Sequence, residues 1–454
     1  MNFPEPGHSS SSLQSISKIE NLMDPAGNII LNMTEKEALE RIQSGEPNAV
    51  RGIDGQFAIC THQGRTVRMA RSIGRPMRYF LAKQADGPCL IVAETMDKIQ
   101  SKLSELGLAD QFHPSYTRMV PAHYLVEIEL VGCPDPNPVY ERFFTPKRNR
   151  LAPDLESIGD AYITQLAAEC DRWLATLDDR EPIGVLFSGG IDSGAVLIVL
   201  NELILRRGQA PTRLKAFTLG AEGRSQDAQQ AHNFLTQCGL SHLWELMEVD
   251  SSRLDWRQAV RWIEDYKPLD VQSATMAIAL CREIRTKYPE WRLLVDGDGG
   301  DENLKDYPIE DNPELTIRSV LNNLMLYQEG WGVHAIKHSL VYSGGQSRGH
   351  VRTWAPATRL GFVGFSPFAL PSVIEVAEGI PFIELTNWSH ERLYELKGQI
   401  VQRGVRRLTG IEMPVFPKRR FQHGAVSEES FATLFPRDER SYRDELMSHF
   451  SKSL

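Results

Sequence analysis

The sequence lacks paired cysteines, an excess of basic charge and long hydrophobic runs, and each absence argues against a class of protein. Its 454 residues contain six scattered cysteines and no C-x-x-C pair, which argues against a zinc ribbon, a thioredoxin-like redox site or a secreted disulfide scaffold. The formal net charge of −9 at pH 7 argues against nucleic-acid binding through a broad basic surface. No apolar run approaches the ~18–20 residues that span a bilayer, so no membrane contact is expected.

The N-terminal stretch MNFPEPGHSSSSLQS has neither the basic nor the apolar region of a secretory signal. Residues 1–18 are rich in Ser, Pro and Gly, and we predict a disordered leader there. A chain of this length is expected to form two or three domains. These features predict a soluble, cytoplasmic protein.

Residues 19–146 have the pattern of an α+β domain, and residues 147–155, which carry a proline and basic residues, are a predicted linker. Short alternating segments predict strands in antiparallel sheet, and two stretches of helical periodicity lie among them. The predicted strands are 55–62, 66–72, 89–94 and 123–130, and the predicted helices are 35–45 and 95–107.

Residues 156–430 have a different pattern, in which apolar strands alternate with helices. This alternation predicts an α/β domain with a parallel, Rossmann-like sheet, whose ligands would bind at the carboxyl ends of the strands. Residues 311–407 are predicted to be mostly helical, and residues 431–454 are predicted to be a polar, loosely held tail. The predicted strands are 183–187, 214–219, 243–249 and 292–296, and the predicted helices are 157–177, 193–206, 225–239 and 271–288.

The clearest motif is Ser188-Gly189-Gly190-Ile191-Asp192-Ser193, which lies between a predicted strand and a predicted helix. Two glycines let the backbone curl around phosphate oxygens, and the N–H groups that open the helix point at such an anion. The hydroxyls of Ser188 and Ser193 are further donors. Asp192 would repel a bare phosphate, so it implies a bridging divalent cation, most simply Mg²⁺. No Walker A pattern occurs, and the alternative is a plain strand-to-helix turn.

A second glycine-rich segment, Asp296-Gly297-Asp298-Gly299-Gly300-Asp301-Glu302, follows the predicted strand 292–296. An EF-hand calcium loop needs a ligand at its fifth position and glycine at its sixth. This segment has Gly300 and Asp301 at those positions, so the calcium interpretation fails. An acidic surface turn remains as the alternative to a second part of a nucleotide site.

The first motif resembles the pyrophosphate-binding loop of the N-type ATP pyrophosphatases, and the two motifs together point to a narrower family. Their order and spacing over roughly residues 156–425 resemble the synthetase domain of asparagine synthetase and its relatives β-lactam synthetase, carbapenam synthetase and the lasso-peptide cyclases. A third segment, 417–424, is similar to the late lysine loop of that family, with Lys418 three residues before Phe421. The resemblance implies an adenine nucleotide alpha hydrolase-like sheet for this domain.

The N-terminal half shows a weaker resemblance. Residues 52–58 (GIDGQFA), 71–79 and 121–125 (PAHYL) are similar to the later part of a class II glutaminase domain, which implies an Ntn-hydrolase-like fold. Those glutaminases use an N-terminal cysteine whose own α-amine activates its thiol. Here position 2 is Asn2 and the first cysteine is the internal Cys60. We therefore expect a shortened, inactive glutaminase-like domain.

The resemblance implies ATP and Mg²⁺ as cofactors and assigns roles to individual residues. Lys418 would stabilise charge on the α-phosphate and later on the acyl oxygen. Asp298 would either position and deprotonate the amine or act as a second metal ligand. By the same resemblance, the β- and γ-phosphates would be bound by Ser188, Gly189, Gly190 and Ser193. Mg²⁺ would be bound by Asp192 and Asp301, and the adenine and ribose would be lined by Leu186, Leu219 and Gly297.

The predicted activity is that of an ATP-dependent amide-forming ligase. It would adenylate a small-molecule carboxylate, release pyrophosphate and pass the acyl group to ammonia or an amine, without glutaminase activity of its own. The alternatives are intramolecular lactam formation, sulfur or tRNA chemistry, and a degenerate synthetase that acts as a binding partner. The oligomeric state, including a homodimer, stays open.

Three weaker signals lie between residues 343 and 370. Val363, Phe365 and Leu370 stand where asparagine synthetases carry charged residues, which favours either a substrate less polar than aspartate or simple helix packing. The segment 343–347 (SGGQS) imitates the first motif without its aspartate, so we predict a flexible loop. Arg348, Arg352 and Arg359 would form a solvated basic face or contact an anionic substrate or partner.

Overall fold

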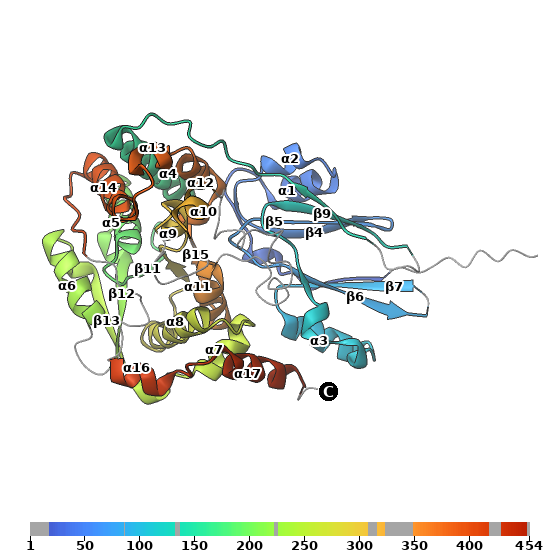
Figure 1. Ribbon diagram of the computed structural model, residues 1–454. Helices are drawn as coiled ribbons and strands as arrows, with labels where there is room; N and C mark the ends of the chain where they lie inside the picture. The colour runs from blue at the N-terminus through green and yellow to red at the C-terminus, as the bar shows by residue number, and fades with distance from the viewer. Residues whose placement is uncertain are drawn as a thin grey trace, which may run out of the picture.

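The computed structural model describes residues 18–85, 87–131, 137–221, 226–306, 316–322, 348–416 and 428–451. The N-terminal part of the chain forms two stacked four-stranded sheets, which lie beside the sheet of the second unit (Figure 1). One sheet has the order β1-β7-β6-β8 and the other the order β10-β9-β5-β4. The strands are β1 Lys18–Asn21, β4 Ala58–Gln63, β5 Thr66–Arg71, β6 Arg78–Gln84, β7 Gly87–Ala93, β8 Arg118–Met119, β9 Tyr124–Glu129 and β10 Val139–Arg142, with a small pair, β2 Ile29–Ile30 and β3 Gly55–Gln56.

Alternating side chains hold the two sheets together, since every second residue of a strand points to the same face. The buried layer between them includes Val67 and Met69 of β5, Leu90 and Val92 of β7, and Val126 of β9. The helices α1 Glu35–Gln43 and α3 Met96–Glu105 pack on the outer faces, α1 on β4 and β5 and α3 on β6 and β7. A short helix, α2 Pro47–Arg51, follows α1. This unit is therefore layered as helix, sheet, sheet, helix.

The predicted helices and strands of this unit are confirmed, except that residues 55–62 form two strands, β3 and β4. The sequence patterns did not predict β1, β2, β6, β8 and β10, and the pairing of the strands differs in two ways. The strands belong to two sheets, and β1 pairs with β7 in parallel rather than antiparallel, with Lys18 opposite Cys89. Lys18, the last residue of the predicted leader, is instead the first residue of β1. Residues 1–17 lie outside the described part of the chain.

The second unit is built on a parallel sheet of five strands in the order β13-β12-β11-β14-β15, which confirms the predicted parallel sheet. The chain adds β12 and β13 on one side of β11, and then β14 and β15 on the other. Ligands bind at such a point of reversal, outside the carboxyl ends of the strands. The strands are β11 Ile183–Leu186, β12 Leu214–Ala221, β13 Trp244–Val249, β14 Leu293–Val295 and β15 Val363–Phe365.

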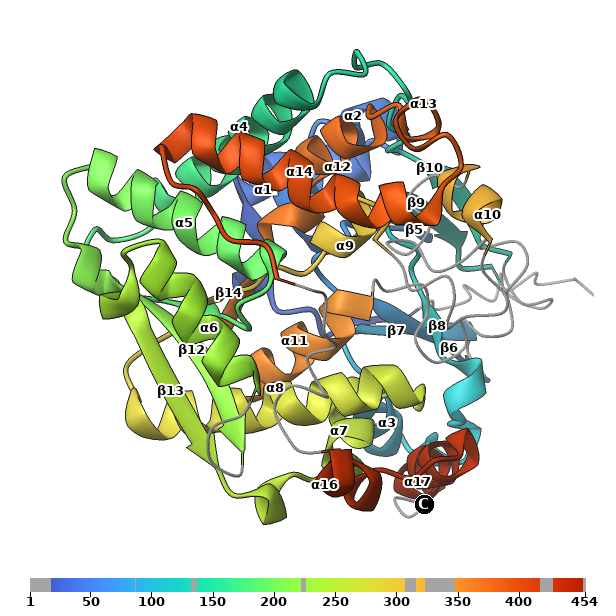
Figure 2. The same ribbon diagram turned by 60° about the vertical axis from the view of Figure 1, so that its left-hand side comes forward.

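Helices cover both faces of this sheet, as Figure 2 shows. One group consists of α4, α5, α6, α12 and α14, and the other of α7, α8 and α11. The bounds are α4 Leu155–Leu174, α5 Ile191–Arg206, α6 Gln226–Gln237, α7 Trp256–Ile263, α8 Pro268–Lys287, α11 Arg348–Arg359, α12 Pro371–Glu378 and α14 His390–Thr409, with the short helices α9 Gly300–Asn303, α10 Ile317–Asn322 and α13 Phe382–Thr386. The fifth strand, β15, lies in a region predicted to be mostly helical.

The C-terminal residues correct one expectation. They were predicted to be loosely held, but they form α16 Glu428–Leu434 and α17 Glu439–Ser451. Tyr442, Leu446 and Phe450 of α17 are buried, because α17 packs against α7 and its Phe450 carbonyl accepts a hydrogen bond from Gln100 of α3, 3.0 Å away. Among the described residues, no helix combines the length and the apolar character needed to cross a membrane.

Candidate active site

The first glycine-rich loop connects β11 to α5 and is held in a tight curl. Gly189 has a φ of 75°, a conformation that favours glycine. A Cβ at Gly189 would also lie 2.7 Å from the backbone nitrogen of Ala231 in α6, so the loop presses directly on that helix. The Gln230 side chain donates a hydrogen bond of 3.1 Å to the Gly189 carbonyl. Only glycine satisfies both the backbone conformation and this close approach.

The two predicted phosphate-binding hydroxyls lie inside the curl. The backbone N–H of Gly190 donates to Ser188 Oγ at 3.4 Å, and that of Ser188 donates to Ser193 Oγ at 3.5 Å. Gly190 is the residue before α5 and offers no side chain to cap the first N–H groups of that helix. The loop thus presents hydroxyls and backbone N–H groups toward the carboxyl edge of the sheet, which is a suitable cradle for an anion.

The second glycine-rich loop connects β14 to α9 and packs against the first. A Cβ at Gly297 would lie 2.6 Å from the Ser193 nitrogen, and a Cβ at Gly300 would collide with the carboxylate of Asp192. Two segments about one hundred residues apart in the chain therefore touch because both glycines lack a side chain. This contact brings Asp301, at the start of α9, to the side of Asp192.

A buried lysine joins the two loops. Lys397 of α14 has a side chain that is only 3% exposed. Its Nζ lies 2.6 Å from Asp192 Oδ2, contacts Asp301 Oδ1 and lies 3.4 Å from Asp306 Oδ2. Burial alone would lower the pKa of this lysine, but the three carboxylates outweigh it and hold the pKa well above its usual value. The structure therefore brings the predicted metal ligands Asp192 and Asp301 to one cationic atom.

Sequence reasoning missed Lys397 and Asp306. A usable signal was present for the lysine, since α14 buries Leu393, Leu396, Ile400 and Val401 on one face. Lys397 lies within that apolar stripe, where a charged residue needs a buried partner. Asp306 has no comparable signal, because its approach to Lys397 depends on the turn after α9.

Asp298, the predicted base, is partly exposed in the second loop. Its backbone N–H donates a 3.0 Å hydrogen bond to Oδ1 of Asp296. Asp296 is buried at the end of β14, and this burial raises its pKa to about 7, although hydrogen bonds from Ser366 and from the Asp298 backbone act in the opposite direction. Asp296 thus anchors the backbone that carries Asp298.

The residues predicted to surround the adenine and ribose differ in exposure. Gly297 and Leu186 are partly exposed at the carboxyl edge of the sheet. Leu219 is only 1% exposed and belongs to the hydrophobic core under β12. The structure therefore leaves Leu186 and Gly297 accessible and places Leu219 beneath the surface.

Val363, Phe365 and Leu370 replace charged residues of asparagine synthetases, which favoured a less polar substrate as one of two explanations. Two of these three are core residues. Phe365 stacks on Trp173, with ring centroids 4.5 Å apart, and Leu370 is fully buried. Val363 is partly exposed in the edge strand β15. Packing accounts for Phe365 and Leu370, so neither supports a less polar substrate.

Several predicted features lie outside the described part of the chain: Lys418 with its loop 417–424, the loop 343–347, and the predicted helix cap Ser225. The side chains of Arg348 and Arg352 are likewise not described. Arg359 is described, and it pairs with Asp97 of α3 at 2.7 Å. This contact joins the two units of the chain.

The residues at the junction of the loops suit Mg²⁺ in one particular mode. In the described ranges, no three His, Cys, Asp or Glu side chains are arranged as a metal site. Mg²⁺, however, is usually bound through one or two carboxylates together with substrate phosphates and waters. Asp192 and Asp301, which both contact the Lys397 ammonium group, fit that mode. A bound Mg²⁺ would neutralise phosphate charge there.

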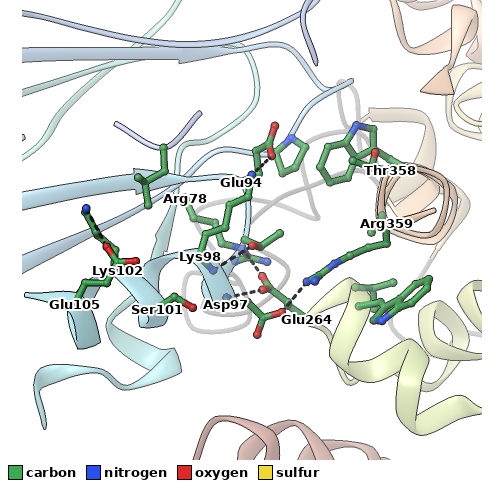
Figure 3. A pocket seen from close by; sticks show the side chains of 17 residues that line it. Arg78, Glu94, Asp97, Lys98, Ser101, Lys102, Glu105, Glu264, Thr358 and Arg359 are labelled. Carbon is green, nitrogen blue, oxygen red and sulfur yellow. Dashed lines mark hydrogen bonds and ion pairs between the residues drawn. The ribbon is translucent and has the colours of Figure 1, made fainter. Parts of the chain in front are cut away.

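A large cavity lies elsewhere, between the two units (Figure 3). It has a volume of about 630 Å³, and none of its lining residues belongs to the glycine-rich loops. Its walls come from α3, from the end of α7 and from α11, and they include the buried pair Arg78 and Glu264, 3.1 Å apart. Paired charges of both signs line this cavity, and we assign no part of the nucleotide chemistry to it.

Comparison with known proteins finds a family match within the second unit. The family model described as asparagine synthase matches residues 174–355, a range that contains both glycine-rich loops and the first four strands of the parallel sheet. In a comparison with curated proteins, no protein matches the chain. The members of the matched family are ATP-dependent ligases. Residues 174–355 of the chain, which carry both glycine-rich loops, are thus similar to the asparagine synthase family.

Proposed function

We propose that this protein adenylates a carboxylate with ATP, releases pyrophosphate, and transfers the acyl group to ammonia or an amine. The observation that carries the proposal is that Asp192 and Asp301 both contact the ammonium group of Lys397, at the carboxyl edge of the sheet. An anion cradle beside a pair of carboxylates suits a nucleotide triphosphate with its metal. The family match, an ATP-dependent amide-forming ligase domain, supports the same reaction class.

The proposed reaction has two steps. A substrate carboxylate oxygen attacks the α-phosphorus of ATP, the bond from that phosphorus to the bridging oxygen breaks, and pyrophosphate leaves. The amine nitrogen then attacks the activated acyl carbon, AMP leaves with the electron pair of the acyl–oxygen bond, and the nitrogen loses a proton. Ser188, Gly189, Gly190 and Ser193 bind the β- and γ-phosphates, while Asp192 and Asp301 hold Mg²⁺.

Asp298 is the proposed acceptor of the amine proton. Support comes from its position on the second loop, next to the metal ligands, and from the anchoring of its backbone by Asp296. A role as a second metal ligand is the alternative. Lys418 is proposed to stabilise negative charge on the α-phosphate and on the acyl oxygen, and Leu186 and Gly297 are proposed to contact the adenine and ribose.

We propose that the N-terminal unit is a glutaminase-like domain without glutaminase activity. Its layering of helix, sheet, sheet and helix supports an Ntn-hydrolase-like fold. The thiol of Cys60 is buried in β4, and burial raises its pKa to about 12, while burial also raises the pKa of Cys89. A thiol with a raised pKa is a poor nucleophile. Nitrogen would therefore come from free ammonia or an amine.

The test is carboxylate-dependent release of pyrophosphate from ATP and Mg²⁺, measured over a panel of carboxylates with and without amines. We expect release that requires a carboxylate, and amide product when an amine is added. Amide formed without an added amine would identify the intramolecular, lactam-forming alternative. Release that depends on a thiol or on tRNA, or no release with any carboxylate, would refute the proposal.

Lys418→Ala separates chemistry from binding. We expect it to abolish amide formation and to leave the affinity for the nucleotide within about threefold, because a charge that acts on the transition state contributes little to ground-state binding. Isothermal titration with a non-hydrolysable ATP analogue provides the binding measurement. An equal loss of binding and chemistry would mean that the lysine only anchors the nucleotide.

A further inference from the structure

The site predicted to hold a divalent metal already contains a positive charge from the chain itself. Lys397 Nζ lies 2.6 Å from Asp192 Oδ2 and contacts Asp301 Oδ1. Asp301 comes from α9, Asp192 from α5 and Lys397 from α14. Three elements that are distant in the chain thus meet at one ammonium group, and the lysine side chain is only 3% exposed.

The lysine and a metal ion would compete for the same two carboxylates, Asp192 and Asp301. An ammonium group within 2.6 Å of a carboxylate oxygen occupies the space where a cation would bind that oxygen. A Mg²⁺ ion coordinated by both carboxylates would also lie close to the ammonium and repel it, strongly so in a buried site. Without an additional anion, this repulsion opposes the binding of Mg²⁺ while the ammonium group stays in place.

A triphosphate changes this balance, because its oxygens can accept hydrogen bonds from the lysine and coordinate the metal. Asp306 supports such an exchange on the protein side. Its Oδ2 is 3.4 Å from Lys397 Nζ, its side chain is 9% exposed, and its backbone N–H donates to the Asp301 carbonyl at 3.0 Å. Asp306 can therefore keep one contact with the ammonium when the other two carboxylates turn to a metal.

We propose that Lys397 is a resident cation that holds Asp192 and Asp301 together in the nucleotide-free protein and yields them to Mg²⁺ only when a triphosphate is bound. This inference rests on the proposed function. It makes Lys397 a positioning residue that couples metal binding to nucleotide binding. The protein would consequently bind metal weakly on its own and tightly together with ATP.

The test measures metal binding without turnover. Mn²⁺ replaces Mg²⁺, and electron paramagnetic resonance of free Mn²⁺ gives the affinity with and without a non-hydrolysable ATP analogue. For the wild-type protein we expect the analogue to tighten Mn²⁺ binding at least tenfold. In Lys397→Met, which keeps an unbranched side chain one atom shorter and removes its charge, nucleotide-free Mn²⁺ binding should tighten at least tenfold and the effect of the analogue should shrink.

The wild-type measurement is decisive even if the variant does not fold. Tight Mn²⁺ binding by the wild-type protein without nucleotide would overturn the inference, as would equal nucleotide-free affinities in wild type and Lys397→Met. Lys36→Met, at a lysine whose side chain is 86% exposed, is the matched control and should behave as wild type. Failure of the ATP analogue to bind at all in calorimetry would instead refute the proposed function.

Discussion

At the residue scale, the buried carboxyl of Asp296 shows how the site holds its loop. Asp296 ends β14 and accepts the backbone N–H of Asp298, and burial raises its pKa to about 7. A carboxyl whose pKa is higher in the folded than in the unfolded state binds more protons when folded. Its ionisation therefore costs stability as the pH rises from about 4 to about 7.

Asp296→Asn should remove this cost. The asparagine side chain can still accept the N–H of Asp298 but cannot ionise, so we expect the variant to unfold at a higher temperature than wild type at pH 8. The difference should shrink toward pH 5, where Asp296 is protonated. Thermal unfolding at both pH values checks this, with the exposed Asp110→Asn as the control. An equal difference at both pH values would contradict the assigned pKa shift.

Lys397 differs from the two aspartates that it contacts in how far the sequence reveals its role. The two aspartates that it binds were singled out from their motifs, because glycine-rich loops with acidic residues have recognisable local chemistry. The lysine has no such motif and differs from a surface lysine only by its place in an apolar stripe of α14. Which charges it meets depends on how α14 packs against α4 and α5.

At the element scale, the approach of the two glycine-rich loops is the feature on which the site depends. Gly300→Ala adds one methyl group that would collide with the Asp192 carboxylate. We expect this variant to fold but to lose at least tenfold in affinity for a non-hydrolysable ATP analogue, measured by calorimetry. Gly364→Ala in β15 has no atom within 4 Å of its added Cβ and should bind as wild type. Equal binding by both variants would mean that the loop contact is not required.

The strands and helices predicted between residues 157 and 296 lie within a few residues of those in the structure, although α7 was not predicted. Helix α8 begins at Pro268, three residues before the predicted start, since proline is favoured in the first turn of a helix. Strand β15 was missed because its three residues lie within the region 311–407, which was predicted to be mostly helical. Its place beside β14 comes from parallel pairing with a distant segment, Val295 opposite Phe365.

At the scale of the whole molecule, buried ion pairs connect the two units. Arg78 of β6 reaches Glu264, the residue after α7, at 3.1 Å, and both side chains are at most 3% exposed. Glu264 also accepts the backbone N–H of Asp97, where α3 begins. Burial raises the pKa of Glu264, and the charge of Arg78 opposes this effect. The arginine therefore offsets part of the cost of burying this carboxyl group of the other unit.

Removing one partner of this ion pair should destabilise the folded protein. Arg78→Met leaves Glu264 buried without its arginine, and we expect a loss of about 3 kcal/mol or more in the free energy of unfolding by urea. The double variant Arg78→Met, Glu264→Met should recover much of that loss. Arg68→Met, whose partner Glu127 is 42% exposed, is the control and should cost less than about 1 kcal/mol. Additive losses in the double variant would show that the pair does not connect the units.

The sequence by itself determined the local chemistry of this protein: the two glycine-rich loops, their positions after β11 and β14, and the alternation that makes a parallel sheet. These follow from backbone conformation and side-chain periodicity over short stretches. Only the tertiary structure decided that Lys397 stands between Asp192 and Asp301, that Phe365 and Leu370 are core residues, and that α17 is held against both units. Such contacts join segments far apart in the chain, so they depend on packing, which no local pattern encodes.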